Sequence, residues 1–308
     1  MEAQIYKEVR EWMYRNARPV DLCLWQYYFE QGKKEDVVSA LLHYQNADGG
    51  FGHALEADNW NPESTPITTQ HALKILEEIG FFDMEHPVYQ GIFSYLESGK
   101  DLREYGWCFT VPGNDRGPHA PWWNYSEEFN RQQYFGVTAE FCAFILKWGD
   151  RESALYRTAL DLTDALLEKL MSGADFGDSG IAGYITLVES LKEAKLNQYD
   201  CEALKKVLAG KIRDSIEYDT TKWETYVTRP SSYIQSPESV FFEENAEIVK
   251  TELNYLKDTR PEGSVWGITW TWFDQMEKYS REFAISENWW KGYHAIEKMK
   301  FLRNFEAI

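Results

Sequence analysis

Apolar residues recur with the period of an α-helix along most of the chain, and this spacing predicts a fold built mainly of helices. The pattern is clear in residues 34–46 and again in residues 66–79. The second segment also carries start signals, because Ser64 or Thr65 can cap a helix whose first position suits Pro66. These two segments are predicted to pack as a helical hairpin.

Helical spacing continues beyond this hairpin, whereas Val, Ile and Thr never gather into the alternating runs typical of strands. Further helices are expected at about 2–15, 18–31, 86–98, 133–148, 152–171, 179–194, 199–216, 237–257 and 285–304. No flexible linker interrupts them. The longest non-helical stretch, 99–132, is rich in Gly, Pro, Trp and Asn, which is typical of a structured functional loop. The sequence therefore predicts an all-α protein with a single domain over residues 1–308.

Short connections between the expected helices repeatedly pair glycine with a large aromatic residue. The clearest connection reads Gln45-Asn46-Ala47-Asp48-Gly49-Gly50-Phe51-Gly52, and weaker copies lie at 96–107, 172–177 and 256–267. Glycine can adopt the positive φ that ends a helix, and the aromatic ring can then fold back over that helix end. Gln45 and Asp48 would satisfy free backbone N–H groups of the next helix. Four copies indicate a repeat of stacked hairpins, which forms an α/α toroid if the array closes.

Charge and composition exclude several kinds of partner. The 50 acidic and 32 basic residues give a net charge of −18, which disfavours nucleic acid and anionic membranes. No apolar stretch approaches the ~18 residues of a membrane span, and no signal peptide is visible. The four cysteines, Cys23, Cys108, Cys142 and Cys201, lie far apart and are interpreted as reduced thiols of a cytoplasmic protein. Neither a metal nor a cofactor is expected.

Residues 45–52 resemble the Q-x-x-D-G-G-F/W motif of the terpenoid cyclase and protein prenyltransferase superfamily, in which the squalene–hopene cyclase type is an α/α toroid. The continuation through His53–Asp58 and Ser64-Thr65-Pro66, and the loop at 118–123, resemble a group of small bacterial proteins with prenyltransferase-like repeats. The resemblance implies a helical toroid and an isoprenoid-like substrate. The sequence contains neither the Asp-x-Asp-Asp motif of the proton-initiated cyclases nor the zinc ligands of the prenyltransferases, so enzymatic activity is left open.

The first candidate site comprises His53, Glu56 and Asp58, close to Asp48 of the motif. A carboxyl group in an aromatic pocket has a raised pKa and can protonate an alkene or a glycosidic oxygen. Glu56 or Asp58 would be this acid. The alternative is structural, with Asp48 capping a helix and the other two carboxylates ordering a loop.

The second candidate site is the loop that carries His119, Trp122, Trp123 and Asn124, preceded by Trp107 and Phe109. Tryptophan faces can stabilise a developing cation or stack on a sugar ring. We expect Phe51, Trp107, Trp122, Trp123 and Asn124 to bind substrate, and His53, Glu56, Asp58 and His119 to act as catalytic groups.

The remaining aromatic and basic clusters are interpreted as structural. Trp266, Trp270, Trp272 and Asp274, together with Trp289 and Trp290, are expected to seal the last repeat to the first. Three arginines could meet an anionic ligand but are more typical of surface pairs: Arg116, Arg131 and Arg229.

Three functions fit the sequence. The leading hypothesis is an isoprenoid-binding pocket at the centre of the toroid, with acid catalysis if the protein is an enzyme. A carbohydrate-active (α/α)-barrel enzyme would need two carboxylates across a cleft and a sugar-like substrate. The third hypothesis is a non-catalytic interaction module. The oligomeric state is left open.

Overall fold

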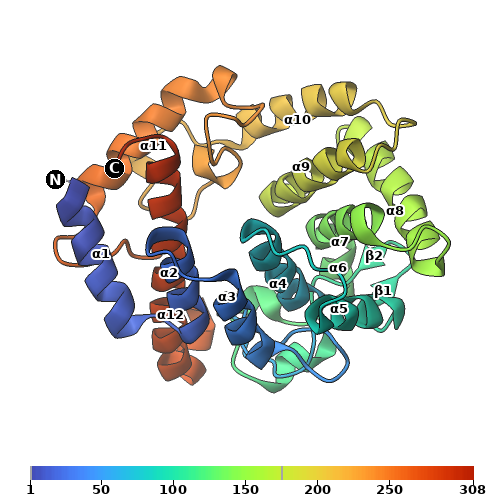
Figure 1. The fold of residues 1–308 in the computed structure, drawn as a ribbon, viewed down its shortest axis with the longest axis horizontal. Helices are drawn as coiled ribbons and strands as arrows, with labels where there is room; N and C mark the ends of the chain where they lie inside the picture. Colours follow the sequence, from blue (N-terminus) through green and yellow to red (C-terminus); the bar gives the residue numbers. More distant parts are fainter. Residues whose placement is uncertain (1, 175) are drawn as a thin grey trace. The chain divides into compact units, whose positions relative to one another are not determined.

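The computed structural model describes residues 2–174 and 176–308, and over those residues it contains twelve α-helices and a single two-residue hairpin. The expectation of an all-α protein is confirmed (Figure 1). Close contacts divide the chain into two compact units. The terminal unit comprises Met1–His43 and Ile216–Ile308, and the middle unit comprises Tyr44–Ser215.

The middle unit is built around one apolar helix, α7. Its helices are α4 (Pro66–Glu78), α5 (Pro87–Glu97), α6 (Glu127–Gln133), α7 (Phe135–Trp148), α8 (Ala154–Met171), α9 (Gly177–Glu193) and α10 (Cys201–Ser215). Helix α7 packs against α4, α8 and α9. At the crossing with α9, a Cβ atom on Gly183 would lie 2.6 Å from the carbonyl oxygen of Gly136, so the two backbones need glycine to approach this closely.

The helices of the middle unit begin at side-chain caps that the sequence provides. Thr65 accepts a hydrogen bond from the backbone N–H of Thr68, and Pro66 occupies the first helical position, as predicted for α4. Ser126 and Ser153 cap α6 and α8 in the same way.

The segment at 99–132 is ordered, as predicted, but part of it is helical. Strands β1 (Leu102–Arg103) and β2 (Gly106–Trp107) form a hairpin, followed by short 3-10 turns at Pro112–Arg116 and Pro121–Trp123. Helix α6 then begins at Glu127, inside the stretch expected to be non-helical, whereas the helix expected at 133–148 is present as α7. The buried amide of Asn130 on α6 bonds to Thr110 in the loop and fixes the loop against the helix.

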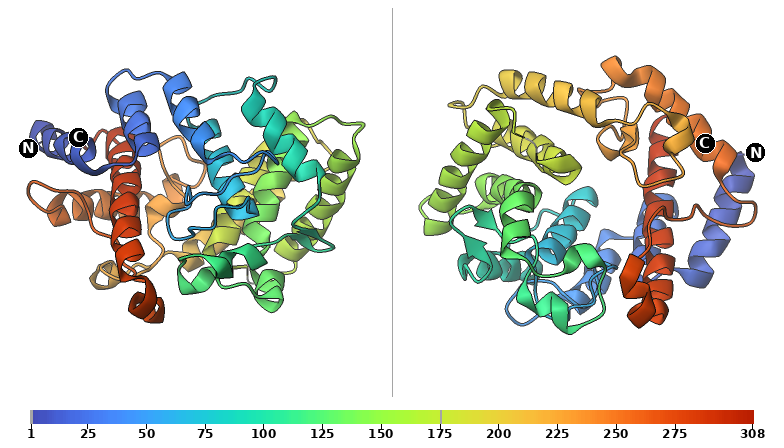
Figure 2. Two further views of the ribbon diagram at one scale, coloured as in Figure 1. Left: turned by 90° about the horizontal axis from the view of Figure 1, so that it is seen from below. Right: turned by 180° about the vertical axis from the view of Figure 1, so that it is seen from behind.

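The terminal unit joins the two ends of the chain. Its helices are α1 (Glu2–Asn16), α2 (Pro19–Phe29), α3 (Lys34–Leu41), α11 (Ala246–Thr259) and α12 (Met276–Asn304). Helix α12 packs against α1, α2 and α11, and Figure 2 shows it beside the first two helices. The guanidinium of Arg18 lies 5.3 Å from the Trp289 ring centroid, and Trp272 is fully buried against Phe283. Trp289 therefore joins the C-terminal segment to the N-terminal one, whereas Trp272 packs within the C-terminal segment.

The expected helix at 237–257 begins later than predicted, at Ala246. The preceding residues form turns, because Ser239 accepts a hydrogen bond from the N–H of Phe241 and Asn245 donates one to the Phe241 carbonyl. Such side chains compete with the hydrogen bonds of a helix. Apolar spacing alone does not reveal this competition.

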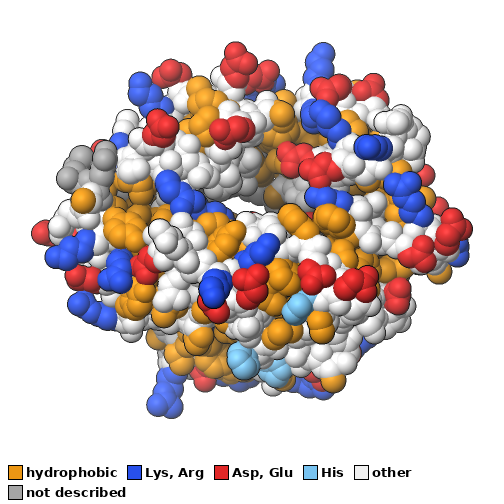
Figure 3. All heavy atoms as spheres, viewed as in Figure 1, with side chains coloured by type: hydrophobic (Ala, Val, Ile, Leu, Met, Phe, Trp, Pro, Cys, Tyr) orange, Lys and Arg blue, Asp and Glu red, His pale blue; other side chains and the backbone are white. Residues whose placement is uncertain are grey.

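No helix in the described part of the chain has the length and apolar character needed to cross a membrane. Acidic and basic side chains are mixed over the face drawn in Figure 3, so the net charge of −18 is not gathered there into one acidic patch. Each of the four cysteines is a free thiol.

Candidate functional site

The motif loop at 45–52 is held by close backbone contact with α5. Gly49 has a φ of +88°, and a Cβ atom there would lie 2.0 Å from the carbonyl oxygen of Gly91. The side-chain amide of Gln45 donates to the carbonyls of Gly49 at 2.8 Å and Val88 at 3.0 Å. Gln45 therefore donates to carbonyl groups, whereas the sequence suggested that it would accept from N–H groups of the next helix.

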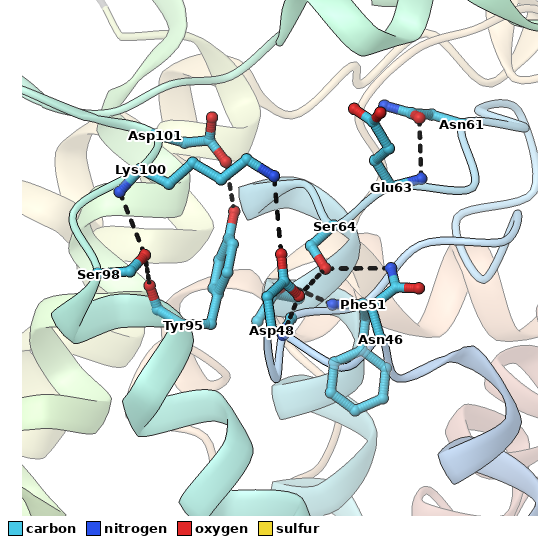
Figure 4. A network of polar contacts seen from close by, with 12 residues as sticks. Asn46, Asp48, Phe51, Asn61, Glu63, Ser64, Tyr95, Ser98, Lys100 and Asp101 are labelled. Atoms are coloured by element: carbon cyan, nitrogen blue, oxygen red, sulfur yellow. Dashed lines mark hydrogen bonds and ion pairs between the residues drawn. The ribbon is translucent and has the colours of Figure 1, made fainter.

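Asp48 ties this loop to its surroundings (Figure 4). One carboxylate oxygen accepts hydrogen bonds from the Gly50 N–H at 3.1 Å and the Ser64 hydroxyl at 2.5 Å. The other lies 3.6 Å from the ammonium of Lys100. Asp48 thus accepts hydrogen bonds from its own loop and from Ser64, and not from the free N–H groups of the next helix.

All four repeat loops contain a glycine with positive φ and a buried aromatic residue. The glycines are Gly49, Gly99, Gly106, Gly173, Gly177 and Gly263, and the aromatic residues are Phe51, Trp107, Phe176 and Trp266. The Trp266 indole donates to the carbonyl of Leu256 and so folds back over α11, as predicted. Asp175, within the third copy, lies outside the described residues.

The structure brings the two predicted site loops together. Asn59 and His119 form an antiparallel bridge, and the N–H of Ala120 donates to the Asp58 carbonyl at 2.9 Å. The Trp60 N–H donates to Pro118, also at 2.9 Å. Residues more than fifty positions apart therefore form one loop cluster in the middle unit.

The polar candidates in this loop cluster differ in exposure. Glu56 is 6% exposed, Asp58 1% and His119 4%, whereas His53 is exposed and lies 2.9 Å from the side-chain oxygen of Asn46. His119 lies 2.8 Å from the exposed Asn124, joining two of the predicted residues. The deep burial of both carboxylates fits the structural alternative, in which they order the loops.

The aromatic candidates are mostly packed inside the middle unit. Phe51 and Trp107 are fully buried, and the Trp107 ring contacts Phe141 of α7 at 5.2 Å. Trp123 stacks on Phe109 at 5.0 Å, and its buried indole N–H has no hydrogen-bond partner among the described residues. Trp122 is half-buried and thus accessible to a ligand.

A second group of acids, which the sequence analysis did not single out, lies on the helices of the middle unit. Glu77 is on the last turn of α4 and Glu140 on α7, and both are half-buried. Burial, followed by the Glu140 carboxylate, raises the pKa of Glu77 from 4.5 to about 7. Burial also raises the pKa of Glu140, while a hydrogen bond from Gln70 and the charge of Lys74 oppose this increase.

One aromatic residue, Tyr89, lies close enough to Glu77 for the two groups to interact electrostatically. The pKa of Tyr89 is raised by burial and by the Glu77 carboxylate, so the two groups are electrostatic neighbours. Tyr89 stacks between Phe81, at 6.2 Å, and Phe144, at 5.8 Å. Glu77 therefore combines partial exposure, an aromatic neighbour and a pKa of about 7, at which the carboxyl group is partly protonated at neutral pH. These properties suit a general acid.

One sequence signal could have identified Glu140. From Phe135 to Leu146, α7 contains no other charged residue, and all eleven of its other positions are buried. A single carboxylate in such a helix requires a compensating interaction or retains a proton. Glu77 has no comparable signal, because it is followed by another glutamate on a surface-facing turn.

The described residues contain no group of three or more His, Cys, Asp or Glu side chains arranged to hold a metal ion. Comparison of the chain with protein-family models, curated proteins and solved structures finds no match.

Proposed function

We propose that the protein is a cytoplasmic, terpenoid cyclase-like or prenyltransferase-like α/α toroid that binds an isoprenoid-like apolar molecule and protonates it. The observation that carries this proposal is the half-buried Glu77 carboxyl group, whose pKa is about 7 and whose neighbours include the Tyr89 ring. A carboxylic acid with a pKa near 7 stays partly protonated at physiological pH and can donate a proton to an alkene, and a nearby aromatic face can stabilise the resulting cation.

Glu77 replaces Glu56 and Asp58 as the preferred acid in this proposal. Glu56 and Asp58 are almost completely buried within the loop cluster, whereas Glu77 is accessible enough to meet a substrate. Glu140 would act as a positioning residue, because its carboxylate helps to keep Glu77 protonated. Trp122 remains the proposed aromatic contact of the loop cluster because it is half-buried, whereas Trp123 is as deeply buried as Glu56.

Deuterium incorporation tests this proposal. The protein would be incubated in D₂O with farnesol and geranylgeraniol, and the recovered isoprenoids would be analysed by mass spectrometry. If the protein catalyses by acid, the wild type should yield deuterated products. E77Q should incorporate deuterium at least about a hundredfold more slowly, and E56Q/D58N, the matched carboxylate control, should incorporate it at the wild-type rate.

The alternative outcomes are distinct. If deuterium incorporation were lost in E56Q/D58N but retained in E77Q, the catalytic acid would be Glu56 or Asp58 of the loop cluster. Deuteration that persists in E77Q, E140Q and E56Q/D58N would refute acid catalysis by any of these groups. No isoprenoid turnover by the folded wild type, together with no bound isoprenoid after crystal soaking, would refute the substrate class.

A carbohydrate-active enzyme is the second candidate, because Glu77 and Glu140 are two interacting carboxyl groups on adjacent helices. Glycoside hydrolysis uses such a pair. Hydrolysis of oligosaccharides that is lost in both E77Q and E140Q would favour this function over the isoprenoid one. A folded protein inactive on both substrate classes would favour the non-catalytic interaction module.

A further inference from the structure

The terminal unit contains a buried charged site that the proposed function does not use. At its centre is Glu252 of α11, whose side chain is fully buried. The carboxylate accepts hydrogen bonds from the Ser231 hydroxyl at 2.6 Å and the Ser231 N–H at 2.8 Å. Arg229 lies 3.7 Å from the same carboxylate. Glu252 is thus held by two hydrogen bonds from Ser231 and by an ion pair with Arg229.

Lys298 on α12 lies in the same region without a close anionic partner. Its ammonium is 5.6 Å from the Trp266 ring centroid, and the side chain is half-buried. No hydrogen bond, and no ion pair within 4 Å, joins it to another residue that the structure describes. Burial first, and then the charge of Arg229, lowers the pKa of Lys298 to about 7, although Glu252 opposes this decrease.

Other lysines on α12 do not share this environment. Lys300 pairs with Glu297 at 3.1 Å and has only 13% of its side chain exposed. Lys291 pairs with Glu287 at 2.5 Å. Each of these two amines therefore has a carboxylate within 4 Å, whereas no carboxylate of a described residue lies that close to Lys298.

An aromatic surface adjoins Lys298 along the same helix. His294 and Trp290 precede it by one and two turns, and their rings stack with centroids 5.2 Å apart. Trp270 contacts both rings at 5.6 Å and is half-buried. The charged and titratable groups around Lys298 are thus Arg229 from the segment before Pro230, Glu252 from α11, and His294 and Glu297 from its own helix.

We propose that Lys298 forms an imine with an organic carbonyl compound that carries an anionic group, and that Arg229 binds that group. The neutral amine adds to the carbonyl carbon, and one proton moves from nitrogen to oxygen to give a carbinolamine. The C–O bond then breaks, and the hydroxyl group leaves as water with the second proton of the nitrogen. Hydrolysis reverses the step, so no oxidant or reductant is required. A desolvated lysine beside a second cation is the arrangement that activates an amine for this chemistry.

Arg229 is suited to the anion because its guanidinium is not fully used by Glu252. Nε lies 3.7 Å from the carboxylate, beyond hydrogen-bond distance, and no hydrogen bond joins the guanidinium to another described residue. Its side chain is 20% exposed. A carboxylate or phosphate can therefore reach these donors while Trp266 and Trp270 contact the organic part of the ligand. This inference is independent of the acid chemistry proposed for the middle unit.

The experiment uses pyridoxal 5′-phosphate, an aldehyde with a phosphate group, followed by borohydride reduction of the full-length protein. Mapping of the labelled peptides is expected to show one pyridoxyl group per chain at Lys298, formed at least about tenfold faster at neutral pH than at Lys300. K298M should lose this label, whereas K300M, the matched control, should retain it.

Arg229 is tested by comparing pyridoxal 5′-phosphate with pyridoxal. We expect the wild type to prefer the phosphorylated aldehyde by about tenfold or more and R229M to lose this preference. Label distributed over exposed lysines, or an equal rate at Lys298 and Lys300, would overturn the imine site. Equal preference in the wild type and R229M would overturn the anion site. Peptide mapping of the wild type keeps the test decisive if K298M fails to fold.

Discussion

Replacing Glu77 with glutamine should change how the stability of the protein depends on pH. The native state raises the pKa of Glu77 from 4.5 to about 7, so between these values it binds more protons than the unfolded chain. Stability is therefore lost as pH rises through this interval. Full ionisation at high pH corresponds to a cost of about 3 kcal/mol, which solvent access to the half-buried carboxylate reduces to about 1–2 kcal/mol.

Glutamine resembles the protonated acid at every pH. E77Q should therefore match the wild type near pH 5 and be more stable by about 1–2 kcal/mol near pH 8.5. Urea unfolding followed by circular dichroism at both pH values measures this difference. E78Q is the control, because Glu78 lies 3.9 Å from Lys74 in a partly exposed ion pair and should change stability by less than about 1 kcal/mol at either pH.

The reasoning would be refuted if E77Q were no more stable than the wild type at pH 8.5, or if E78Q showed the same gain. The electrostatic coupling to Glu140 has its own signature. E140Q should lower the pKa of Glu77, so the double variant should gain less than the sum of the two single variants.

Two further variants test the packing described above. G49A should destabilise the protein by more than about 2 kcal/mol because the new Cβ meets the Gly91 carbonyl at 2.0 Å, whereas G99A, with φ of +63° and open space around it, should cost only about 1 kcal/mol. Equal losses in urea unfolding would contradict the backbone contact. E252A should cost about 3 kcal/mol or more because it leaves Arg229 and Ser231 without their buried acceptor, and E252Q should cost less because it keeps an acceptor for Ser231. Thermal unfolding that ranked the two variants in the opposite order would show that this acceptor is unimportant.

Local signals in the sequence were sufficient for much of the fold. Thr65 and Pro66 mark the start of α4 because capping and proline geometry act within one helical turn. The glycine of each repeat loop has positive φ for a similarly local reason. The toroid itself stays a prediction, since it depends on how the hairpins are arranged beyond each turn.

Site chemistry was less accessible from the sequence because it depends on neighbours that are distant along the chain. The sequence singled out Glu56 and Asp58 from their proximity to a motif, and burial places both inside the loop cluster. Glu77 and Lys298 have ordinary sequence surroundings. Their pKa values are shifted by burial and by Glu140 and Arg229, respectively, and neither environment exists until the helices pack.

The assembly of the terminal unit from both chain ends has a consequence for synthesis. Residues 44–215 are one continuous segment, so every contact within the middle unit becomes possible once Ser215 has been translated. Helices α1 and α2 emerge before this segment, and their partner α12 emerges after it. At about 5–20 residues per second, the apolar faces of α1 and α2 wait on the order of tens of seconds for that partner. The apolar faces of α1 and α2 are thus translated before the middle unit but lack this partner until after the middle unit is complete.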